Sequence, residues 1–312
     1  MARVLVTGGA GFIASHVADA LIAKGHTVAI VDNLVTGFKE NVNPKAIFYE
    51  ADIRDAGRMA EIFDEFKPEY VDHHAAQMDV RKSTVDPVFD AQCNILGSLN
   101  LILNARKHKI NKFIYVSTGG AVYGDVKPDV LPLGEEYPVN PICQYGISKH
   151  TVEHYLFLER YLYNQQYTVL RYPNVYGPRQ NPKGEAGVTA IFVGQMLRGE
   201  QPKIFGDGSK TRDYVFIADV VKANVLAIES DFNGILNIGS GKGTSDQEIF
   251  DACAAATGFK GKPVYESVRP GEVPHICLDG TKAKNVLGWA PTVSLADGIA
   301  KVFEYNRQRL RA

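Results

Sequence analysis

The sequence predicts an α/β protein with a doubly wound parallel sheet and a smaller, interleaved α/β domain. Two observations carry this prediction. In the first half of the chain, short apolar runs alternate with longer amphipathic segments, which is the pattern of parallel strands with helices on both faces. Beyond Tyr172 the sequence changes to loops rich in proline and glycine, such as Gly177-Pro-Arg-Gln-Asn-Pro182, with shorter helical segments. We therefore expect a second, smaller domain there.

The expected elements follow one another in a regular order. The first strand, residues 3–6, is followed by a helix at 16–24, and further strands are expected at 27–31, 46–50, 70–73, 112–117 and 168–170. Residues 214–227 and 235–238 again have the character of sheet-associated segments. The predicted first domain is therefore residues 1–171 with return segments at about 214–239, and the second is residues 172–213 and 240–312.

The composition indicates an ordinary globular protein without a strong global charge. Its 312 residues include 34 basic and 35 acidic side chains, a net charge of -1 that offers no field for nucleic acid or an anionic membrane. The four cysteines are widely spaced and the eight histidines show no metal-binding spacing, so we expect no metal site and a reducing, cytoplasmic location. Apolar runs are too short for a membrane span, and the first strand begins too early for a targeting segment.

A glycine-rich turn after the first strand predicts a dinucleotide site. Gly9-X-Gly11-X-X-Ala14 opens a helix, and Asp32 ends the next strand 18 residues after Ala14. Gly11 lets the backbone approach a pyrophosphate at the helix N-terminus. Asp32 would bond the adenosine ribose hydroxyls and repel a 2′-phosphate, so the expected cofactor is NAD, not NADP. Asp52, after the third strand, suits either a contact to adenine or a helix N-cap.

The segment Tyr145-Gly-Ile-Ser-Lys149 predicts a tyrosine base beside this cofactor. On a helix, residues four apart project from one face, so the phenol and the ammonium can approach the same hydroxyl. Tyrosine titrates near pH 10 and is a poor base at neutral pH unless its anion is stabilised. One cation about 4 Å away, at an effective dielectric of about 20, contributes roughly 4 kcal/mol, or about three pKa units. Lys149 is therefore expected to bring the Tyr145 phenolate into a useful range.

These residues and six further motifs resemble the extended short-chain dehydrogenase/reductase family, and within it the UDP-glucose 4-epimerases. The resemblance runs from Arg3 to about Trp289, through His74-Ala-Ala-Gln77, Val122-Tyr-Gly124, Arg171-Tyr-Pro-Asn174, Tyr176-Gly-Pro-Arg179, Arg212-Asp-Tyr214 and Arg269-Pro-Gly-Glu272. It implies a Rossmann-like NAD-binding domain, a nucleotide-sugar-binding domain, and inversion at C4 of UDP-glucose or UDP-galactose through a transient 4-keto sugar. The implied NAD-binding residues are Gly8, Gly11, Phe12, Ile13, Asp32, Asn33, Asp52, Ile53, Ala75, Asn94, Tyr145 and Lys149. For Asn94, an equally good interpretation is a buried polar residue that is bonded to the backbone.

The family's catalytic tyrosine and lysine fall on Tyr145 and Lys149, but its serine or threonine is displaced. Family members commonly carry that hydroxyl four residues before the tyrosine of Val-Tyr-Gly, where this sequence has Gly119. The segment looks one residue longer, so Thr118 is the best candidate to hold the sugar O4, and Ser117 is the second. The alternative is that both hydroxyls end a strand and bond to the local backbone.

The resemblance also assigns the substrate contacts and the quaternary structure. It places Asn174, Arg212 and Arg269 on the diphosphate, which guanidinium groups bind bidentately. Ile276 matches a position where 4-epimerases carry a bulky tyrosine when they exclude N-acetyl groups and a small residue when they accept them. Ile276 is intermediate in size, so UDP-glucose and UDP-galactose are expected to be preferred, with at most weak turnover of UDP-N-acetyl sugars. Helices at 85–107 and 148–163 carry excess apolar surface and are expected to pair in a four-helix homodimer contact through residues that include Phe89, Leu96, Leu103, Tyr155 and Leu162.

Other activities remain open at this stage. A 4-epimerase of UDP-glucuronate or of a UDP-N-acetylhexosamine is the closest alternative. A nucleotide-sugar dehydratase or decarboxylase usually needs an added acid before Val-Tyr-Gly, and the stretch Thr118-Gly-Gly-Ala121 carries none. An alternative of a different class is a non-catalytic NAD-binding regulator, but such regulators commonly lose the tyrosine and lysine that this chain keeps.

Overall fold

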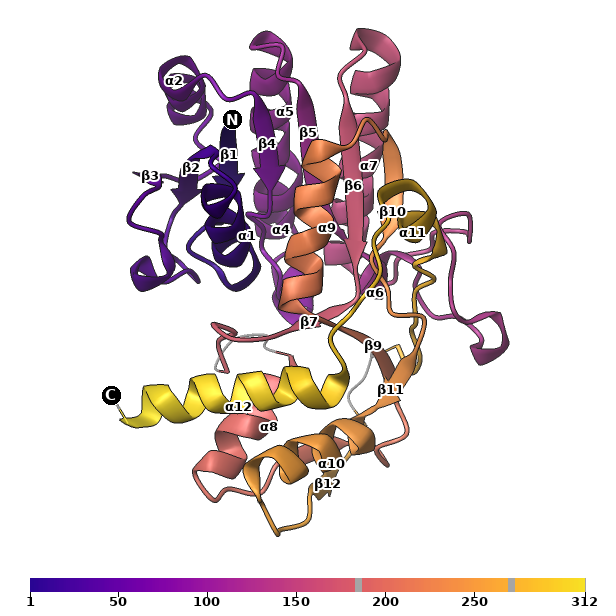
Figure 1. Cartoon of the computed structure of the whole chain (residues 1–312). Helices are drawn as coiled ribbons and strands as arrows, with labels where there is room; N and C mark the ends of the chain where they lie inside the picture. The colour runs from indigo at the N-terminus through magenta and orange to yellow at the C-terminus, as the bar shows by residue number, and fades with distance from the viewer. Residues whose placement is uncertain (183–186, 269–272, 312) are drawn as a thin grey trace.

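The computed structural model describes residues 1–182, 187–268 and 273–311, and its largest element is a seven-stranded sheet (Figure 1). Its strands are β1 (Arg3–Thr7), β2 (Thr27–Asp32), β3 (Ile47–Glu50), β4 (Tyr70–His73), β5 (Lys112–Thr118), β6 (Tyr167–Tyr172) and β10 (Gly234–Asn237). They lie in the order β10-β6-β5-β4-β1-β2-β3, and every neighbouring pair is parallel. The strand order reverses at β1, which is where open doubly wound sheets bind their ligands.

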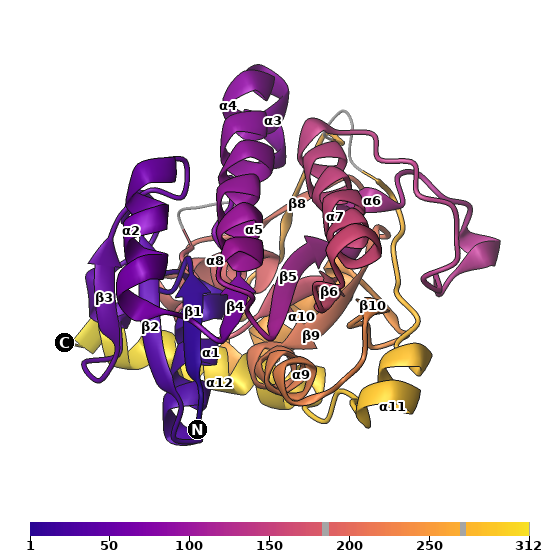
Figure 2. The same cartoon turned by 90° about the horizontal axis from the view of Figure 1, so that it is seen from above.

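Helices cover both faces of this sheet because successive side chains of a strand point to opposite sides. One face is covered by α2 (Ala56–Phe66), α5 (Gly97–Lys107) and α7 (Gln144–Tyr163), as Figure 2 shows from above. The other face is covered by α1 (Phe12–Ala23), α9 (Ile217–Glu229) and α11 (Thr281–Leu287). The side chains of strand β1 alternate between the two faces: Leu5 packs in the core beneath α2, α5 and α7, while Val4 and Val6 pack in the core beneath α1 and α9.

A smaller part of the molecule lies beyond the carboxyl ends of the large sheet, where β6 leads into it (Figure 1). It contains a sheet of β7 (Asn174–Tyr176), β9 (Thr211–Phe216) and β11 (Gly243–Ser245), and a pair of strands, β8 (Lys203–Phe205) and β12 (Val264–Glu266). Helices α8 (Val188–Leu197), α10 (Asp246–Thr257) and α12 (Leu295–Arg311) pack on one another. Trp289 is fully buried, and its Nε1 donates to the Asp219 carbonyl at 2.8 Å, which fastens the C-terminal region to α9.

The expected strands of the large sheet are all present, each within two residues of the predicted ends, but one expected helix is wrong. In place of a single helix at 85–107 the chain forms α3 (Val80–Val85), α4 (Pro87–Ala91), a π-helical segment (Gln92–Leu96) and then α5. The break arises because Pro87 favours a helix start and the Asp86 side chain caps α4 by accepting from the Phe89 N–H at 3.0 Å. The remaining short elements are η1 (Lys39–Asn41), α6 (Gly119–Val122) and η3 (Pro128–Val130).

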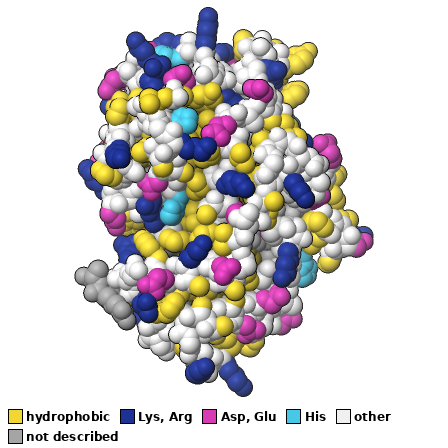
Figure 3. All heavy atoms as spheres, viewed as in Figure 1, with side chains coloured by type: hydrophobic (Ala, Val, Ile, Leu, Met, Phe, Trp, Pro, Cys, Tyr) yellow, Lys and Arg dark blue, Asp and Glu magenta, His cyan; other side chains and the backbone are white. Residues whose placement is uncertain are grey.

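The surface carries both signs of charge. On the face shown in Figure 3, basic and acidic side chains are interspersed and neither sign forms a continuous patch. Within the described ranges, no helix is both long and apolar enough to span a bilayer. In the same part of the chain, no three His, Cys, Asp or Glu side chains come together as metal ligands.

Candidate active site

The turn between β1 and α1 has the backbone geometry of an anion site. Gly8 has a φ of +72°, and a Cβ there would lie 2.9 Å from the Ala75 N, so only glycine allows this approach of the two loops. Helix α1 starts after Gly11 without a side-chain cap, and its first turn, which includes Phe12 and Ile13, carries no acidic residue. The first N–H groups of α1 are therefore left for a ligand, and a phosphate is the group that such a terminus binds.

Asp32 lies at the end of β2, next to this turn. Its Oδ2 accepts from the Ala10 N–H at 3.0 Å and its Oδ1 from the Leu34 N–H at 2.8 Å, so the carboxylate is fixed in direction. Burial raises the pKa of Asp32, while these two hydrogen bonds act in the opposite direction. A Cβ at Gly37 would lie only 2.8 Å from the Ala10 Cβ and 3.0 Å from Asp32 Oδ1, so glycine lets this loop lie close to the acid.

Asp52 is held in a polar cluster rather than at a helix start. Its carboxylate accepts from Arg54 Nε at 3.0 Å and from Asn33 Nδ2 at 2.9 Å, and the bonds from Arg54 above all lower its pKa to about 2. The N-cap alternative for Asp52 is wrong, because Asp55 caps α2 by accepting from the Arg58 N–H. Ile53 is buried against α5, where a Cβ at Gly97 would come within 2.7 Å of it.

Asn94 clamps the loop that follows β4. Its Oδ1 accepts from the Gln77 N–H at 2.8 Å, and its Nδ2 donates to the Gln77 carbonyl at 2.9 Å and to Asp90 Oδ1 at 2.9 Å. The side chain is therefore bonded to the backbone, as the alternative for Asn94 anticipated. In the same loop the Ala75 N–H donates to Thr7 Oγ1 at 3.2 Å.

Sequence reasoning missed Asp90, which connects this loop to α7. Asp90 is fully buried and also accepts from Gln77 Nε2 at 3.0 Å and from Ser148 Oγ at 2.6 Å. Ser148 directly precedes Lys149, so one carboxylate holds the β4 loop and the helix that carries the tyrosine and lysine. The spacing of Asp90 and Asn94, four residues apart on a helical segment, was the available signal.

The structure places Tyr145 in the first turn of α7 and Lys149 one turn later. Lys149 is 3% exposed, and its Nζ donates to the Val116 carbonyl at 2.9 Å, close to the end of β5. Burial lowers the pKa of Lys149 to about 8, although Asp90 and Glu153 act in the opposite direction. Lys149 is therefore mostly cationic at neutral pH, which is the state that stabilises a phenolate.

The two candidate hydroxyls at the end of β5 have different surroundings. Ser117 is 2% exposed, and its Oγ donates to Glu153 Oε1 of α7 at 2.6 Å. Thr118 is half-buried at the start of α6, does not cap that helix, and makes no side-chain hydrogen bond within the described part of the chain. The geometry therefore leaves the Thr118 hydroxyl for a ligand and uses the Ser117 hydroxyl inside the protein.

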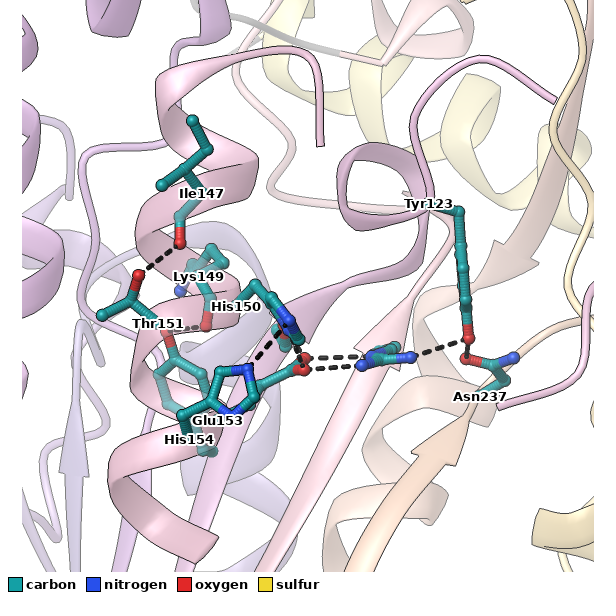
Figure 4. Close-up of polar contacts among 11 residues, drawn as sticks. Tyr123, Ile147, Lys149, His150, Thr151, Glu153, His154 and Asn237 are labelled. Carbon is teal, nitrogen blue, oxygen red and sulfur yellow. Dashed lines mark hydrogen bonds and ion pairs between the residues drawn. The ribbon is translucent and has the colours of Figure 1, made fainter. Parts of the chain in front are cut away.

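A buried ion pair joins α7 to β6 (Figure 4). Arg171 donates from Nε to Glu153 Oε1 at 3.0 Å and from Nη2 to Glu153 Oε2 at 2.6 Å. Its Nη1 donates to the Tyr123 hydroxyl, which in turn donates to Asn237 Oδ1 at 3.0 Å. Burial by itself raises the pKa of Glu153, but the bonds from Arg171, His150 and Ser117 lower it to about 2. This network fixes the distance between α7 and the ends of β5 and β6.

Two of the expected substrate residues, Asn174 and Arg212, lie on the small sheet. Asn174 on β7 pairs with Tyr214 on β9, and Arg212 lies two residues earlier on the same strand. Arg212 Nη1 donates to the Thr211 carbonyl at 2.9 Å, and the Ile276 N–H donates to that carbonyl at 3.2 Å. Ile276 is 3% exposed and packs in one cluster with Val122, Tyr123 and Leu278. Arg269 lies outside the described residues.

Comparisons with known proteins identify the family of this chain. Residues 4–239 match the model of the NAD dependent epimerase/dehydratase family. A UDP-glucose 4-epimerase of Mycolicibacterium smegmatis is 45% identical over 313 residues, covering 98% of this chain and 99% of that protein. The crystal structure of the Thermotoga maritima UDP-glucose 4-epimerase with UDP-glucose has a TM-score of 0.97 and 50% identity, covering 99% of each chain.

A further solved structure, the Thermus thermophilus UDP-glucose 4-epimerase in complex with NAD, has a TM-score of 0.93 and 42% identity. The match covers 98% of this chain and 99% of that one. The region matched by the family model includes the glycine turn, Asp32, and the pair Tyr145 and Lys149. The chain therefore belongs to the NAD-dependent epimerase/dehydratase family.

Proposed function

We propose that this protein is a UDP-glucose 4-epimerase, which interconverts UDP-glucose and UDP-galactose through a transient 4-keto sugar. The observation that carries the proposal is the buried Lys149, one turn after Tyr145, in a chain half identical to an epimerase solved with UDP-glucose. The other UDP-sugars and the non-catalytic regulator are not favoured, because the chain keeps the tyrosine and lysine and its relatives carry the UDP-glucose name.

NAD, the cofactor of this family, fits the residues present. The bare N-terminus of α1 at Gly11, Phe12 and Ile13 would hold the pyrophosphate, and Asp32 the adenosine ribose. Gly8 belongs to the pyrophosphate turn, Asn33, Asp52 and Ile53 would lie on the adenine side, and Ala75 and Asn94 on the nicotinamide side. When bound, NAD supplies a reversible hydride acceptor for C4 of the sugar.

The residues of the chain then move the proton and hold the sugar. Tyr145 would accept the O4 proton as the keto sugar forms and return it in the reverse step. The buried Lys149 ammonium would stabilise the phenolate, and the Thr118 hydroxyl would bond the sugar oxygen. Arg212 and Asn174, with Arg269, would hold the diphosphate while the hexose turns beside Ile276, so that binding energy from UDP supports chemistry at the sugar.

The activity is tested by incubating the purified protein with UDP-glucose, UDP-galactose, UDP-glucuronate and two UDP-N-acetylhexosamines while NMR follows the C4 configuration. We expect UDP-glucose and UDP-galactose to interconvert fastest, with no net cofactor consumption, because the hydride leaves and returns within one cycle. Preferred turnover of another UDP-sugar would reassign the substrate. Stoichiometric accumulation of NADH would replace epimerisation with dehydrogenation.

Replacing Asp32 tests the ribose contact. The variant Asp32→Gly is expected to weaken NAD binding by roughly 10-fold to 100-fold, since hydrogen bonds to a charged group contribute about 1.5–3 kcal/mol. It should also reduce discrimination against NADP, because the repelling charge is lost. Titration of both cofactors, with a thermal melt to confirm folding, measures this. Unchanged NAD affinity would show that the acid does not contact the ribose.

Replacing Thr118 tests the catalytic hydroxyl. The nearly isosteric Thr118→Val is expected to lower kcat by about 10²-fold or more, as removal of a group that assists proton transfer does. Ser117→Ala is the matched control, because the Ser117 hydroxyl bonds Glu153 inside the protein, and its kcat should change far less. Near-normal turnover of Thr118→Val with a slow Ser117→Ala would move the role to Ser117.

We also infer a homodimer in which α5 and α7 pair with their counterparts. Four of the five anticipated apolar residues are exposed on these helices or just before α5: Leu96 at 55%, Leu103 at 47%, Tyr155 at 38% and Leu162 at 59%. The fifth, Phe89, is partly buried beneath the cations of Arg54 and Lys82. An exposed apolar face of this extent is typical of an interface between subunits.

Light scattering at micromolar concentration tests the dimer. The wild-type protein is expected to have twice the chain mass of 34.2 kDa. The double variant Leu103→Glu/Leu162→Glu should shift the protein to monomer by placing charges in the contact. Val286→Glu on α11, a position 43% exposed, is the control and should leave the mass unchanged. A monomeric wild-type protein would overturn the inference.

Two further inferences concern organisation and location. The division into residues 1–171 with about 214–239, and 172–213 with 240–312, is supported by β10, which is a strand of the large sheet, and by α9, which packs on that sheet. A cytoplasmic location is supported by the four cysteines, all of which are free thiols.

A further inference from the structure

Two histidines meet on the outer side of α7. His150 and His154 are one helical turn apart, and their Nε2 atoms are 3.1 Å from each other, with ring centroids 4.5 Å apart (Figure 4). The His150 side chain is 26% exposed and His154 is an exposed residue, so water and ions reach the pair. Histidines four residues apart on a helix present their nitrogens to one point, a metal-binding spacing that sequence reasoning missed.

The hydrogen-bond pattern turns the His150 lone pair toward His154. Glu153 Oε2 lies 2.9 Å from His150 Nδ1, and a carboxylate only accepts, so Nδ1 carries the hydrogen of the neutral ring. The lone pair of His150 is then on Nε2, which faces His154 Nε2. Glu153 cannot turn away, because its two oxygens also accept from Arg171 and Ser117.

We propose that His150 and His154 form a binding site for a divalent transition-metal ion of the Cu²⁺, Ni²⁺ or Zn²⁺ class. Two nitrogens that bind one ion at about 2.05 Å are about 2.9 Å apart at a right angle and about 3.3 Å apart at a tetrahedral angle. The observed 3.1 Å lies between these values. A small rotation of the exposed His154 ring, with its hydrogen moved from Nε2 to Nδ1, directs both lone pairs at the ion without net loss of a proton.

The Glu153 carboxylate, which accepts from His150, is a second feature typical of metal sites. A metal-binding histidine ordinarily donates its second N–H to a carboxylate, which fixes the ring and raises its basicity, and Glu153 does this for His150. Glu153 is 3% exposed and already saturated with donors, so it orients the ligand and does not itself bind the ion. Water completes the coordination, since the described residues supply no third ligand here.

Two other histidines of the chain, His73 and His16, lack this freedom. His73 has one ring nitrogen 2.7 Å from Thr7 Oγ1 and the other 2.8 Å from Ser98 Oγ, both inside the core. His16 Nε2 donates to the Pro178 carbonyl. The proposed site lies on the same helix as the inferred dimer contact, with His150 about 140° from Tyr155 and His154 about 80° from Leu162 around the axis of α7.

The site is tested by titrating the full-length, untagged protein, first treated with a chelator, with CuCl₂ and ZnCl₂ by isothermal calorimetry. We expect one ion per chain, with Cu²⁺ bound more tightly than Zn²⁺, as nitrogen ligands prefer. His154→Ala and His150→Ala should each weaken binding by more than about 10-fold, because loss of a direct ligand costs at least as much as loss of an outer-shell partner. His26→Ala, a histidine between α1 and β2, is the control and should bind as the wild-type protein does.

A second measurement locates the ion. Substoichiometric Cu²⁺ should broaden the imidazole proton signals of His150 and His154 before those of other histidines, and this broadening should vanish in His154→Ala. Wild-type protein that binds neither ion below millimolar concentration would overturn the proposal. Equal affinity of His154→Ala and wild type, or loss of affinity in His26→Ala, would overturn it as well.

Discussion

Tyr145→Phe is expected to lower kcat for UDP-galactose by roughly 10²-fold to 10⁴-fold, the range of a lost general acid and base. Phenylalanine keeps the ring and the first turn of α7 but cannot accept the O4 proton. Lys149 would remain buried and bonded to the Val116 carbonyl, so the helix and the NAD site should be preserved. The loss should therefore appear in kcat while cofactor affinity stays within a few-fold of wild type.

The matched control is Tyr161→Phe, on the same helix and 76% exposed, which should keep full turnover. Single-turnover assays with UDP-galactose, with NAD affinity measured in parallel, separate a chemical loss from a binding loss. If Tyr145→Phe retains more than a tenth of the wild-type kcat, another group removes the proton and the role proposed for Tyr145 is wrong.

Breaking the buried pair of Glu153 and Arg171 is expected to destabilise the protein by about 3–5 kcal/mol. Glu153→Leu leaves Arg171, which is 1% exposed, without its charged partner. Arg171→Met likewise leaves the buried Glu153 carboxylate without a cation. The double variant Glu153→Leu/Arg171→Met removes both charges and should recover most of the loss, because apolar groups can replace a buried pair at little cost.

Urea unfolding of the three variants and the wild-type protein measures these free energies. The control is Lys24→Met, which breaks the exposed pair with Glu229 and should cost within about 1 kcal/mol. Equal destabilisation of single and double variants would contradict a dominant role of the unpaired charge.

The same pair predicts an acid dependence. The pKa of Glu153 is lowered from 4.5 to about 2, so its stabilisation is fully present above pH 4.5 and is lost as the pH falls toward 2. Wild type and double variant should therefore differ little in unfolding free energy above pH 4.5, and the wild type should lose stability relative to the double variant as the pH falls toward 2.

The order of the elements and much of the proposed site could be read from local pattern. The strand at 70–73 has the predicted bounds, and the glycine turn, Asp32, Tyr145 and Lys149 lie on the elements that their spacing indicated. Local pattern suffices here because side-chain periodicity and glycine turns depend on near neighbours along the chain. The resemblance to a known family supplied the sugar, which periodicity does not encode.

Only the tertiary structure showed that the Ser117 hydroxyl is bonded inside the protein, since its partner, Glu153, is 36 residues away in the sequence. Long-range contacts likewise decided that Asn94 bonds to the Gln77 backbone and that Asp90 reaches Ser148, 58 residues away. The contacts of Ser117 and Asp90 depend on which face of α7 meets the sheet, and a short stretch of sequence does not contain that information. The sequence by itself thus determined which residue types stand at each strand end, and the packing of α7 decided which of them are bonded inside the protein.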